Sequence, residues 1–107
     1  MDTGKKRLRS GEKILEIINH YGVMHQLKYF QSEVFELNEA IICCENDDFS
    51  YYDEVCKANK KNIAEEIADV MVMLEQFKLY YDISSEEITN IFWSKVDRQL
   101  ERIKNKE

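Results

Sequence analysis

Residues 23–45 read VMHQLKYFQSEVFELNEAIICCE and carry the clearest helical pattern in the chain. Apolar side chains recur here at alternating spacings of three and four residues, which is the period of a helix with one buried face. The residues in this stripe are Leu27, Phe30, Val34, Leu37, Ile41 and Cys44. The pattern predicts a helix from about Val23 to Glu45 that packs along this stripe.

Two later segments repeat this rhythm. The third helix is predicted to begin near Asn62, because Asn62 followed by Glu65 resembles a capping box. The fourth begins with a stronger capping sequence, Ser84-Ser85-Glu86-Glu87. The two apolar stripes are Ile63, Ile67, Val70, Leu74, Phe77 and Tyr81, and then Ile88, Phe92, Val96, Leu100 and Ile103. Both segments therefore predict amphipathic helices.

The remaining segments are shorter or less regular. A short helix is predicted from about Gly11 to Tyr21, with Gly22 as its stop signal. The segment Asn46–Ser50 has the composition of a loop, and the stretch from there to Lys61 fits either a loop or a helix. Residues 1–10 are polar and basic, which fits a solvated flexible arm or an arm that reaches a neighbouring subunit or a phosphate.

Composition predicts one all-α domain over residues 11–107, and the helical segments with their short connections predict an antiparallel bundle of three to four main helices. The 107 residues include no proline and only three glycines, and 44% are hydrophobic. The net charge of -6 argues against general affinity for nucleic acid, which needs many cationic phosphate contacts.

The sequence also predicts a cytoplasmic protein that has no membrane partner. No apolar run approaches the ~20 residues needed to span a bilayer, and the first residues lack the apolar core of a signal peptide. Cys43, Cys44 and Cys56 lack metal-ligand spacing, so we expect reduced thiols.

Two pairs of acidic residues point to chemistry. Glu33 and Glu36 lie three residues apart in the second predicted helix, as do Glu66 and Asp69 in the third. This spacing places both carboxylates of a pair on one helix face. If the helices are antiparallel, four carboxylates can converge, and such a cluster would hold a hard cation such as Mg²⁺.

A helical wheel places both pairs at the border of the apolar stripes. Gln26, Tyr29 and Ala40 share the edge of the first pair; Asn62, Met73 and Tyr80 share the edge of the second. Most acidic residues on helices merely solvate an outer face, but two pairs at equal spacing beside core stripes are harder to explain in that way.

The fourth predicted helix carries Lys95, Arg98 and Arg102 on one stripe. Basic residues near a helix C-terminus commonly complement the helix dipole. Alternatively, they bind phosphate oxygens, for which Arg is a bidentate donor.

In order and surroundings, these motifs resemble the MazG-like branch of the all-α nucleoside triphosphate pyrophosphohydrolases. That family carries EExxE on one helix and ExxD on a later one; Glu33 and Glu36 match the second and third acids, and Glu66 and Asp69 match ExxD. The likeness extends over about residues 20–104. It also includes Gln26-Leu27, the stretch Ala64–Val70, and Lys95-Val96-Asp97-Arg98 as a closing Lys-x-x-Arg. Ser32 departs from the pattern, because the family usually has the first Glu there.

The resemblance implies a Mg²⁺-dependent enzyme, with Mn²⁺ as an alternative ion, that cleaves the α-β phosphoanhydride bond of nucleoside triphosphates to give a monophosphate and pyrophosphate. The metal ligands would be Glu33, Glu36, Glu66 and Asp69, and Glu36 or Glu66 would also accept the proton of the attacking water. If two ions bind, one could polarise the α-phosphate and the other could orient and deprotonate the attacking water.

The resemblance further implies contacts to the nucleotide from Gln26, Tyr29, Lys95 and Arg98. Tyr29, Phe30, Tyr80 and Trp93 are available to stack on a base, although core or interface packing is the commoner role of such residues. Members of the family work as homodimers or homotetramers, and the high aromatic content of this small chain independently favours assembly.

Three other interpretations stay open. One is a phosphoribosyl-ATP-type pyrophosphohydrolase on a related fold. Another is a non-catalytic helical adaptor or regulator, which Ser32 favours most. The third is a carboxylate-bridged di-iron bundle, which normally needs Glu-x-x-His on two helices. The only histidines, His20 and His25, both precede every acidic pair, which disfavours this interpretation.

Overall fold

The computed structural model describes residues 10–46 and 53–105, with residues 10 and 53–58 described by their backbone alone. The described residues form four helices and no strand: α1 (Ser10–Tyr21), α2 (Val23–Glu45), α3 (Asp53–Tyr80) and α4 (Ser85–Lys104). The all-α prediction is confirmed. The proposed N-terminal arm, apart from residue 10, lies outside the described residues, as do positions 47–50 of the expected loop.

The junction of α1 and α2 is one glycine. Gly22 has a φ of 91°, a conformation that side chains disfavour, and its N–H donates to the carbonyl of Ile18. Its own carbonyl accepts from the N–H of Gln26, which opens α2. The chain can therefore turn sharply between two helices, and the predicted boundaries at Tyr21 and Val23 are confirmed.

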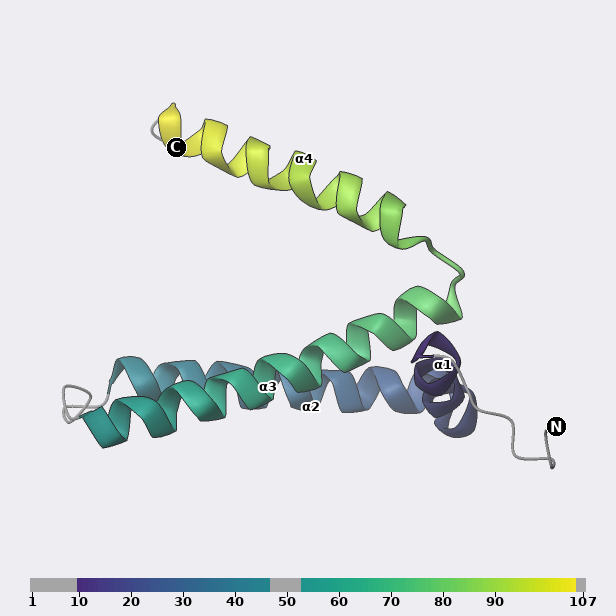
Figure 1. Cartoon of the computed structure of the whole chain (residues 1–107), viewed down its shortest axis with the longest axis horizontal. Coiled ribbons are helices and arrows are strands. Elements are labelled where there is room, and N and C mark those ends of the chain that lie inside the picture. The colour runs from purple at the N-terminus through teal and green to yellow at the C-terminus, as the bar shows by residue number, and fades with distance from the viewer. Residues whose placement is uncertain (1–9, 47–52, 106–107) are drawn as a thin grey trace, which may run out of the picture.

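Helices α2 and α3 form an antiparallel pair, and α1 packs across one end of it (Figure 1). Phe30 of α2 meets Phe77 of α3 edge to face, with ring centroids 5.6 Å apart. The fully buried side chains include Ile18 from α1 and Met73 from α3, and Ala40 of α2 is also buried. The core of this unit is therefore small and lies between the three helices.

The predicted start of α3 is wrong. The helix begins at Asp53, so Asn62 lies in its third turn instead of capping its first. No glycine or proline interrupts residues 53–62, so nothing in the backbone stops the helix from extending. An Asn followed by Glu at the third position also occurs inside helices, which is why this spacing misled the prediction.

The corner between α3 and α4 is closed by backbone hydrogen bonds. The N–H of Asp82 donates to Leu79, and the N–H of Ile83 donates to Lys78, the pattern of a Schellman motif. Asp82 takes the left-handed conformation that this motif requires, with a φ of 53°. Ser84 then caps α4, its Oγ accepting from the Glu87 N–H at 3.1 Å, so the predicted capping sequence is confirmed.

Helix α4 extends away from the α1–α3 unit (Figure 1). Among the described residues, it packs against none of the other three helices, and none of its side chains is buried. The bundle within one chain is therefore built from α1, α2 and α3. No helix in the described part of the chain is long and apolar enough to cross a membrane.

Candidate metal centre and adjoining cavity

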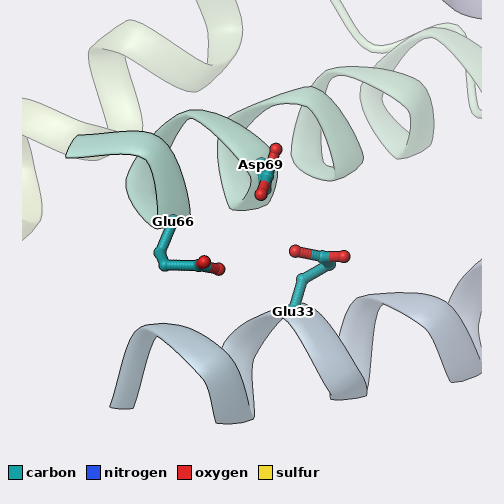
Figure 2. A group of neighbouring side chains, drawn as sticks. All are labelled: Glu33, Glu66 and Asp69. Carbon is teal, nitrogen blue, oxygen red and sulfur yellow. The ribbon is translucent and has the colours of Figure 1, made fainter. Parts of the chain in front are cut away.

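Three of the predicted acidic residues converge between α2 and α3. Figure 2 shows Glu33 extending from α2 toward Glu66 and Asp69 of α3. One carboxylate oxygen from each of the three lies within 4.8 Å of the others. The antiparallel pairing accounts for this arrangement, because each pair presents its acids on the helix edge that faces the other.

The cluster is partly buried: Glu33 is buried, Glu66 is half-buried and Asp69 is exposed. Glu33 is only 5% exposed, and the Oε2 atoms of Glu33 and Glu66 are buried and have no hydrogen-bond partner among the described residues. A buried carboxylate without a partner is costly, since it loses hydration and gains nothing in exchange. A cation between these oxygens would remove that cost, and an all-oxygen ligand set suits Mg²⁺.

The pKa of Glu66 is raised, which also reflects the cost of a negative charge in this cluster. Burial raises it above the ordinary value for a glutamate, and the negative charges of Glu36, Asp69 and Glu33 raise it further. A hydrogen bond with Glu36 also favours the protonated form. Each of these causes disfavours a negative charge at Glu66, and a bound cation would oppose them all.

Glu36 occupies a different position from the other three acids. It is exposed, and it does not belong to the group of three whose oxygens lie within 4.8 Å of one another. It lies close enough to Glu66 to share a hydrogen bond and to raise its pKa. The structure therefore places Glu36 at the margin of the cluster. Ser32, next to Glu33, is exposed.

Tyr29 adds a polar contact one turn before Glu33. Its pKa is raised, first by a hydrogen bond that its hydroxyl makes with the Glu33 carboxylate, and then by the charge of Glu33. Asp69 and Glu36 contribute smaller effects in the same direction. The Oε2 of Glu33 nevertheless has no hydrogen-bond partner among the described residues.

A cavity of about 370 Å³ adjoins the carboxylates. Its walls come from all three packed helices: Ile17, Tyr21, His25, Gln26, Tyr29, Glu33, Asp69, Val72, Met73 and Gln76. Tyr21 and His25 stack at one side, with ring centroids 5.0 Å apart and planes 14° from parallel. The cavity therefore combines flat apolar walls with two of the three clustered carboxylates.

Two buried amides line the inner wall of this cavity. Gln26 is 4% exposed and Gln76 is 1% exposed, and the Nε2 of Gln26 donates to the Oε1 of Gln76 at 2.9 Å. The Nδ1 of His25 lies 2.9 Å from the Oε1 of Gln26, and the Nε2 of Gln76 lies 3.5 Å from the Met73 sulfur. The amides are thus held in fixed positions beside the carboxylates.

The sequence analysis did not predict Gln76, His25 or Tyr21 as site residues, although the spacing of Gln76 offers a signal. Gln26 precedes Glu33 by seven residues, and Gln76 follows Asp69 by seven. Seven residues are close to two helical turns, so each amide shares an edge with an acid. In antiparallel helices these equal offsets bring the two amides together, as they do here.

The predicted phosphate-binding cations do not join this site within one chain. Lys95 and Arg98 lie on α4, where they line a shallow surface hollow with Asn90, Ile91 and Ser94. The remaining aromatic candidates also lie elsewhere: Phe30 packs on Phe77, Tyr80 on Tyr81, and Trp93 on Phe92. Of the four aromatic candidates, Tyr29 alone lines the cavity.

Comparisons of the chain with models of known protein families, with curated proteins and with solved structures found no match.

Proposed function

We propose that this protein is a Mg²⁺-dependent nucleoside triphosphate pyrophosphohydrolase that cleaves the α-β phosphoanhydride bond. The observation that carries the proposal is the convergence of Glu33, Glu66 and Asp69 beside a cavity, together with the buried Oε2 atoms of Glu33 and Glu66, which have no hydrogen-bond partner among the described residues. The resemblance of the motifs to the MazG-like family supplies the reaction class.

The four predicted ligands are chemically suited to Mg²⁺ or Mn²⁺. Glu33, Glu66 and Asp69 would hold the ion between the helices, and Glu36, which lies near Glu66, would be the fourth ligand. When bound, the ion supplies positive charge and Lewis acidity to the triphosphate, which a bare acidic site would repel.

The chain itself would move the proton. A water oxygen forms a bond to the α-phosphorus while the bond from that phosphorus to the α-β bridging oxygen breaks, which releases pyrophosphate and a nucleoside monophosphate. One proton of the water passes to Glu66 or Glu36.

The cavity would hold the nucleoside. Tyr21, His25 and Tyr29 offer flat surfaces for a base, and the two glutamine amides offer donors and acceptors for its edge. Because these groups lie beside Glu33 and Asp69, a base in the cavity would place its phosphates at the carboxylates.

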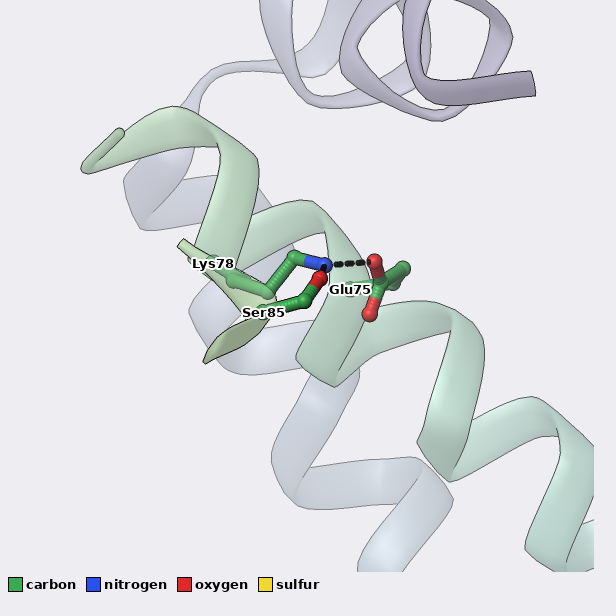
Figure 3. A network of polar contacts seen from close by, with 3 residues as sticks. All are labelled: Glu75, Lys78 and Ser85. Carbon is green, nitrogen blue, oxygen red and sulfur yellow. Dashed lines mark hydrogen bonds and ion pairs between the residues drawn. The ribbon is translucent and has the colours of Figure 1, made fainter. Parts of the chain in front are cut away.

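We assign Lys95 and Arg98 to the phosphates of the leaving pyrophosphate in a homodimer or homotetramer. In the described part of the chain, α4 has no packing contact with α1 or α2 and meets α3 only at their corner, where Lys78 donates to Ser85 (Figure 3), so a second chain would bring these cations to an acidic cluster. Arg is well suited to the role because its planar guanidinium binds two phosphate oxygens at once.

The test is an assay of products with Mg²⁺ and a panel of ribo- and deoxyribonucleoside triphosphates that includes phosphoribosyl-ATP. Pyrophosphate and inorganic phosphate are measured separately. We expect pyrophosphate from at least one member of the panel, and loss of that product when EDTA removes the metal or when Glu33 is changed to Gln.

Glu39→Gln is the matched control, since Glu39 is an exposed acid on the same helix outside the cluster. It should retain full activity. Release of phosphate alone would indicate a different cleaved bond, and absence of turnover with every nucleotide would contradict the proposal in favour of a non-catalytic protein.

A further inference from the structure

The inner wall of the cavity is formed by a chain of hydrogen bonds that runs in one direction. The Nδ1 of His25 lies 2.9 Å from the Oε1 of Gln26, and because a carbonyl oxygen can only accept, the histidine nitrogen is the donor. The Nε2 of Gln26 then donates to the Oε1 of Gln76 at 2.9 Å, and the Nε2 of Gln76 donates to the Met73 sulfur at 3.5 Å. The chain therefore begins at His25 and ends at Met73.

Met73 fixes this direction. It is 2% exposed, and its sulfur lies 3.5 Å from the Nε2 of Gln76 and 4.0 Å from the Nε2 of Gln26. A thioether sulfur accepts hydrogen bonds and has no hydrogen to donate. If both amides were turned over, their buried carbonyl oxygens would face the sulfur without a donor. The amide nitrogens therefore stay on the Met73 side, and the Gln26 oxygen stays toward His25.

His25 is the end of this chain that a ligand can reach. Gln26 and Gln76 are buried, whereas His25 is exposed and lines the cavity. Which imidazole nitrogen carries the proton is set by the hydrogen bond that the other nitrogen makes, and here Nδ1 is the donor. A neutral His25 therefore has its acceptor lone pair at Nε2, and the buried amides hold it in that form.

Tyr21 keeps the imidazole ring in place. Its ring stacks on His25, with centroids 5.0 Å apart and planes 14° from parallel. Together with the hydrogen bond from Nδ1 to Gln26, this contact sets the plane of the imidazole and its rotation within that plane. One face of His25 is covered in this way, so the Nε2 edge is the polar part of the ring that is left for a ligand.

The distance from His25 to the carboxylates suits the far edge of a base. His25 precedes Glu33 by eight residues, which is about 12 Å along a helix. Phosphates held at Glu33 and Asp69 would leave the base to extend along the cavity toward His25. The far edge is where the bases differ, because cytosine and adenine carry an amino donor there, while thymine and guanine carry a carbonyl acceptor.

We infer that His25 is the specificity-determining residue of the cavity, that its Nε2 accepts a hydrogen bond from the amino group of cytosine or adenine, and that nucleotides of uracil, thymine and guanine are disfavoured. The inference rests on the proposed function for the presence of a nucleotide in the cavity. It also narrows the role of His25 from a flat surface to an edge contact, which leaves Tyr29 as the ring that stacks on the base.

Discrimination follows from the buried chain as much as from His25 itself. A base carbonyl at the far edge would set one acceptor against another. To donate to that carbonyl, a neutral His25 would have to move its proton to Nε2, and the buried oxygen of Gln26 would then lose its donor. Gln26, Gln76 and Met73 are therefore positioning residues, which act on the base through His25.

The first experiment measures binding of nucleosides to the full-length chain in EDTA, so it requires neither metal nor turnover. Cytidine with uridine, and adenosine with inosine, form matched pairs that exchange the amino group for a carbonyl. In NMR titrations we expect cytidine and adenosine to bind at least about 5-fold more tightly than their partners, the low end of discrimination by a contact to a base edge. With Mg²⁺ and the corresponding triphosphates, kcat/KM should follow the same order.

The second experiment reads the proton on His25 directly. The ¹⁵N resonances of the imidazole in nucleoside-free protein should show a proton on Nδ1 and none on Nε2. Gln26→Met keeps the length of the side chain but removes the oxygen that holds this proton, so both the tautomer and the nucleoside preference should weaken. Gln31→Met is the matched control, since Gln31 is an exposed glutamine on the same helix, and it should change neither.

A third comparison removes the acceptor alone. His25→Phe keeps a ring that can stack on Tyr21, and it should bind the two members of each nucleoside pair equally. His20→Phe is its control, because His20 is exposed and does not line the cavity; the preference should remain. Helical circular dichroism checks that each variant is folded.

Four results would overturn the inference: equal or tighter binding of uridine and inosine, no binding of any nucleoside, a proton on Nε2 of His25 in the free protein, or a preference that persists in His25→Phe. Its failure is distinguishable from failure of the proposed function. Equal turnover of all the triphosphates would contradict this inference alone, whereas a nucleoside preference without turnover of any triphosphate would contradict the proposed function alone.

Discussion

The three-helix unit of α1, α2 and α3 differs from α4 in the side chains that it buries. The three-helix unit hides polar groups, among them Glu33, Gln26 and Gln76, beside a very small apolar core. Helix α4 has no buried side chain, and its Phe92 and Trp93 are exposed. The buried Oε2 atoms of Glu33 and Glu66, which have no hydrogen-bond partner among the described residues, are the groups that favour a ligand, whereas the exposed apolar side chains of α4 favour contact with another protein surface.

The largest effect should come from the acidic cluster. Glu66→Gln removes the group with the raised pKa and should lower kcat/KM for pyrophosphate release by at least about 100-fold, since even partners of metal ligands cost 10–100-fold when lost. Steady-state kinetics at saturating Mg²⁺ measure this. Glu65→Gln, at the exposed neighbouring position, should leave the rate unchanged, and equal losses in both variants would contradict the assignment.

Next in size is the contrast between two apolar truncations. Ile18→Ala, in the core of the three-helix unit, should lower the free energy of unfolding by about 2–5 kcal/mol at any protein concentration. Leu100→Ala, on the exposed stripe of α4, should cost less than about 0.5 kcal/mol in a dilute monomer and more as concentration rises. Urea unfolding at several protein concentrations gives both values; a concentration-independent cost for Leu100→Ala would weaken the contrast.

The corner that separates the two regions should respond to a single glycine. Asp82 has a φ of 53°, which glycine adopts more easily than aspartate. Asp82→Gly should therefore change stability by no more than about 1 kcal/mol, while Asp82→Val should destabilise by more than that because β-branched residues resist this conformation. Thermal unfolding compares the two variants, and equal melting temperatures would argue against a left-handed corner.

The smallest effect is a dependence of stability on pH in metal-free protein. The pKa of Glu66 is raised in the folded state, so the folded protein binds more protons than the unfolded chain between the ordinary value and the raised one. The free energy of unfolding therefore falls as pH rises from about 4.5 through the raised pKa of Glu66. Above the raised pKa, Glu66 causes no further change. Melting curves of the wild type and Glu66→Gln in EDTA should diverge over this window.

Parallel melting curves in EDTA would show that Glu66 is not perturbed. Saturating Mg²⁺ offers a further comparison, since a bound cation favours the ionised carboxylate and should reduce the difference between the two proteins.

Sequence periodicity was enough to place most of the helices. The boundaries of α1 and α2 follow from Gly22, a residue whose conformation stops one helix and whose carbonyl begins the next. The start of α4 follows from Ser84, since a hydroxyl at that position satisfies a free N–H of the first turn. The start of α3 was missed because a helix interior and a helix cap tolerate the same Asn and Glu.

The candidate site was predictable in part for a physical reason. Equal spacing of acids on two antiparallel helices allows them to meet, and the observed pairing of α2 with α3 brings Glu33, Glu66 and Asp69 together. By contrast, the position of α4 depends on a corner of a few residues, and no periodic pattern encodes its angle. The sequence therefore predicted that Lys95 and Arg98 share a stripe, but it did not predict where that stripe lies.

The most direct test of the account is a calorimetric titration of Mg²⁺ into metal-free protein, without nucleotide. The cluster should bind Mg²⁺ saturably in the wild type and in Glu39→Gln, and the binding should be lost in Glu33→Gln. Glu33→Gln should also raise the melting temperature in EDTA, because it removes one of three like charges whose oxygens lie within 4.8 Å of one another. Absence of saturable binding in the wild type, or equal binding in Glu33→Gln, would contradict the account.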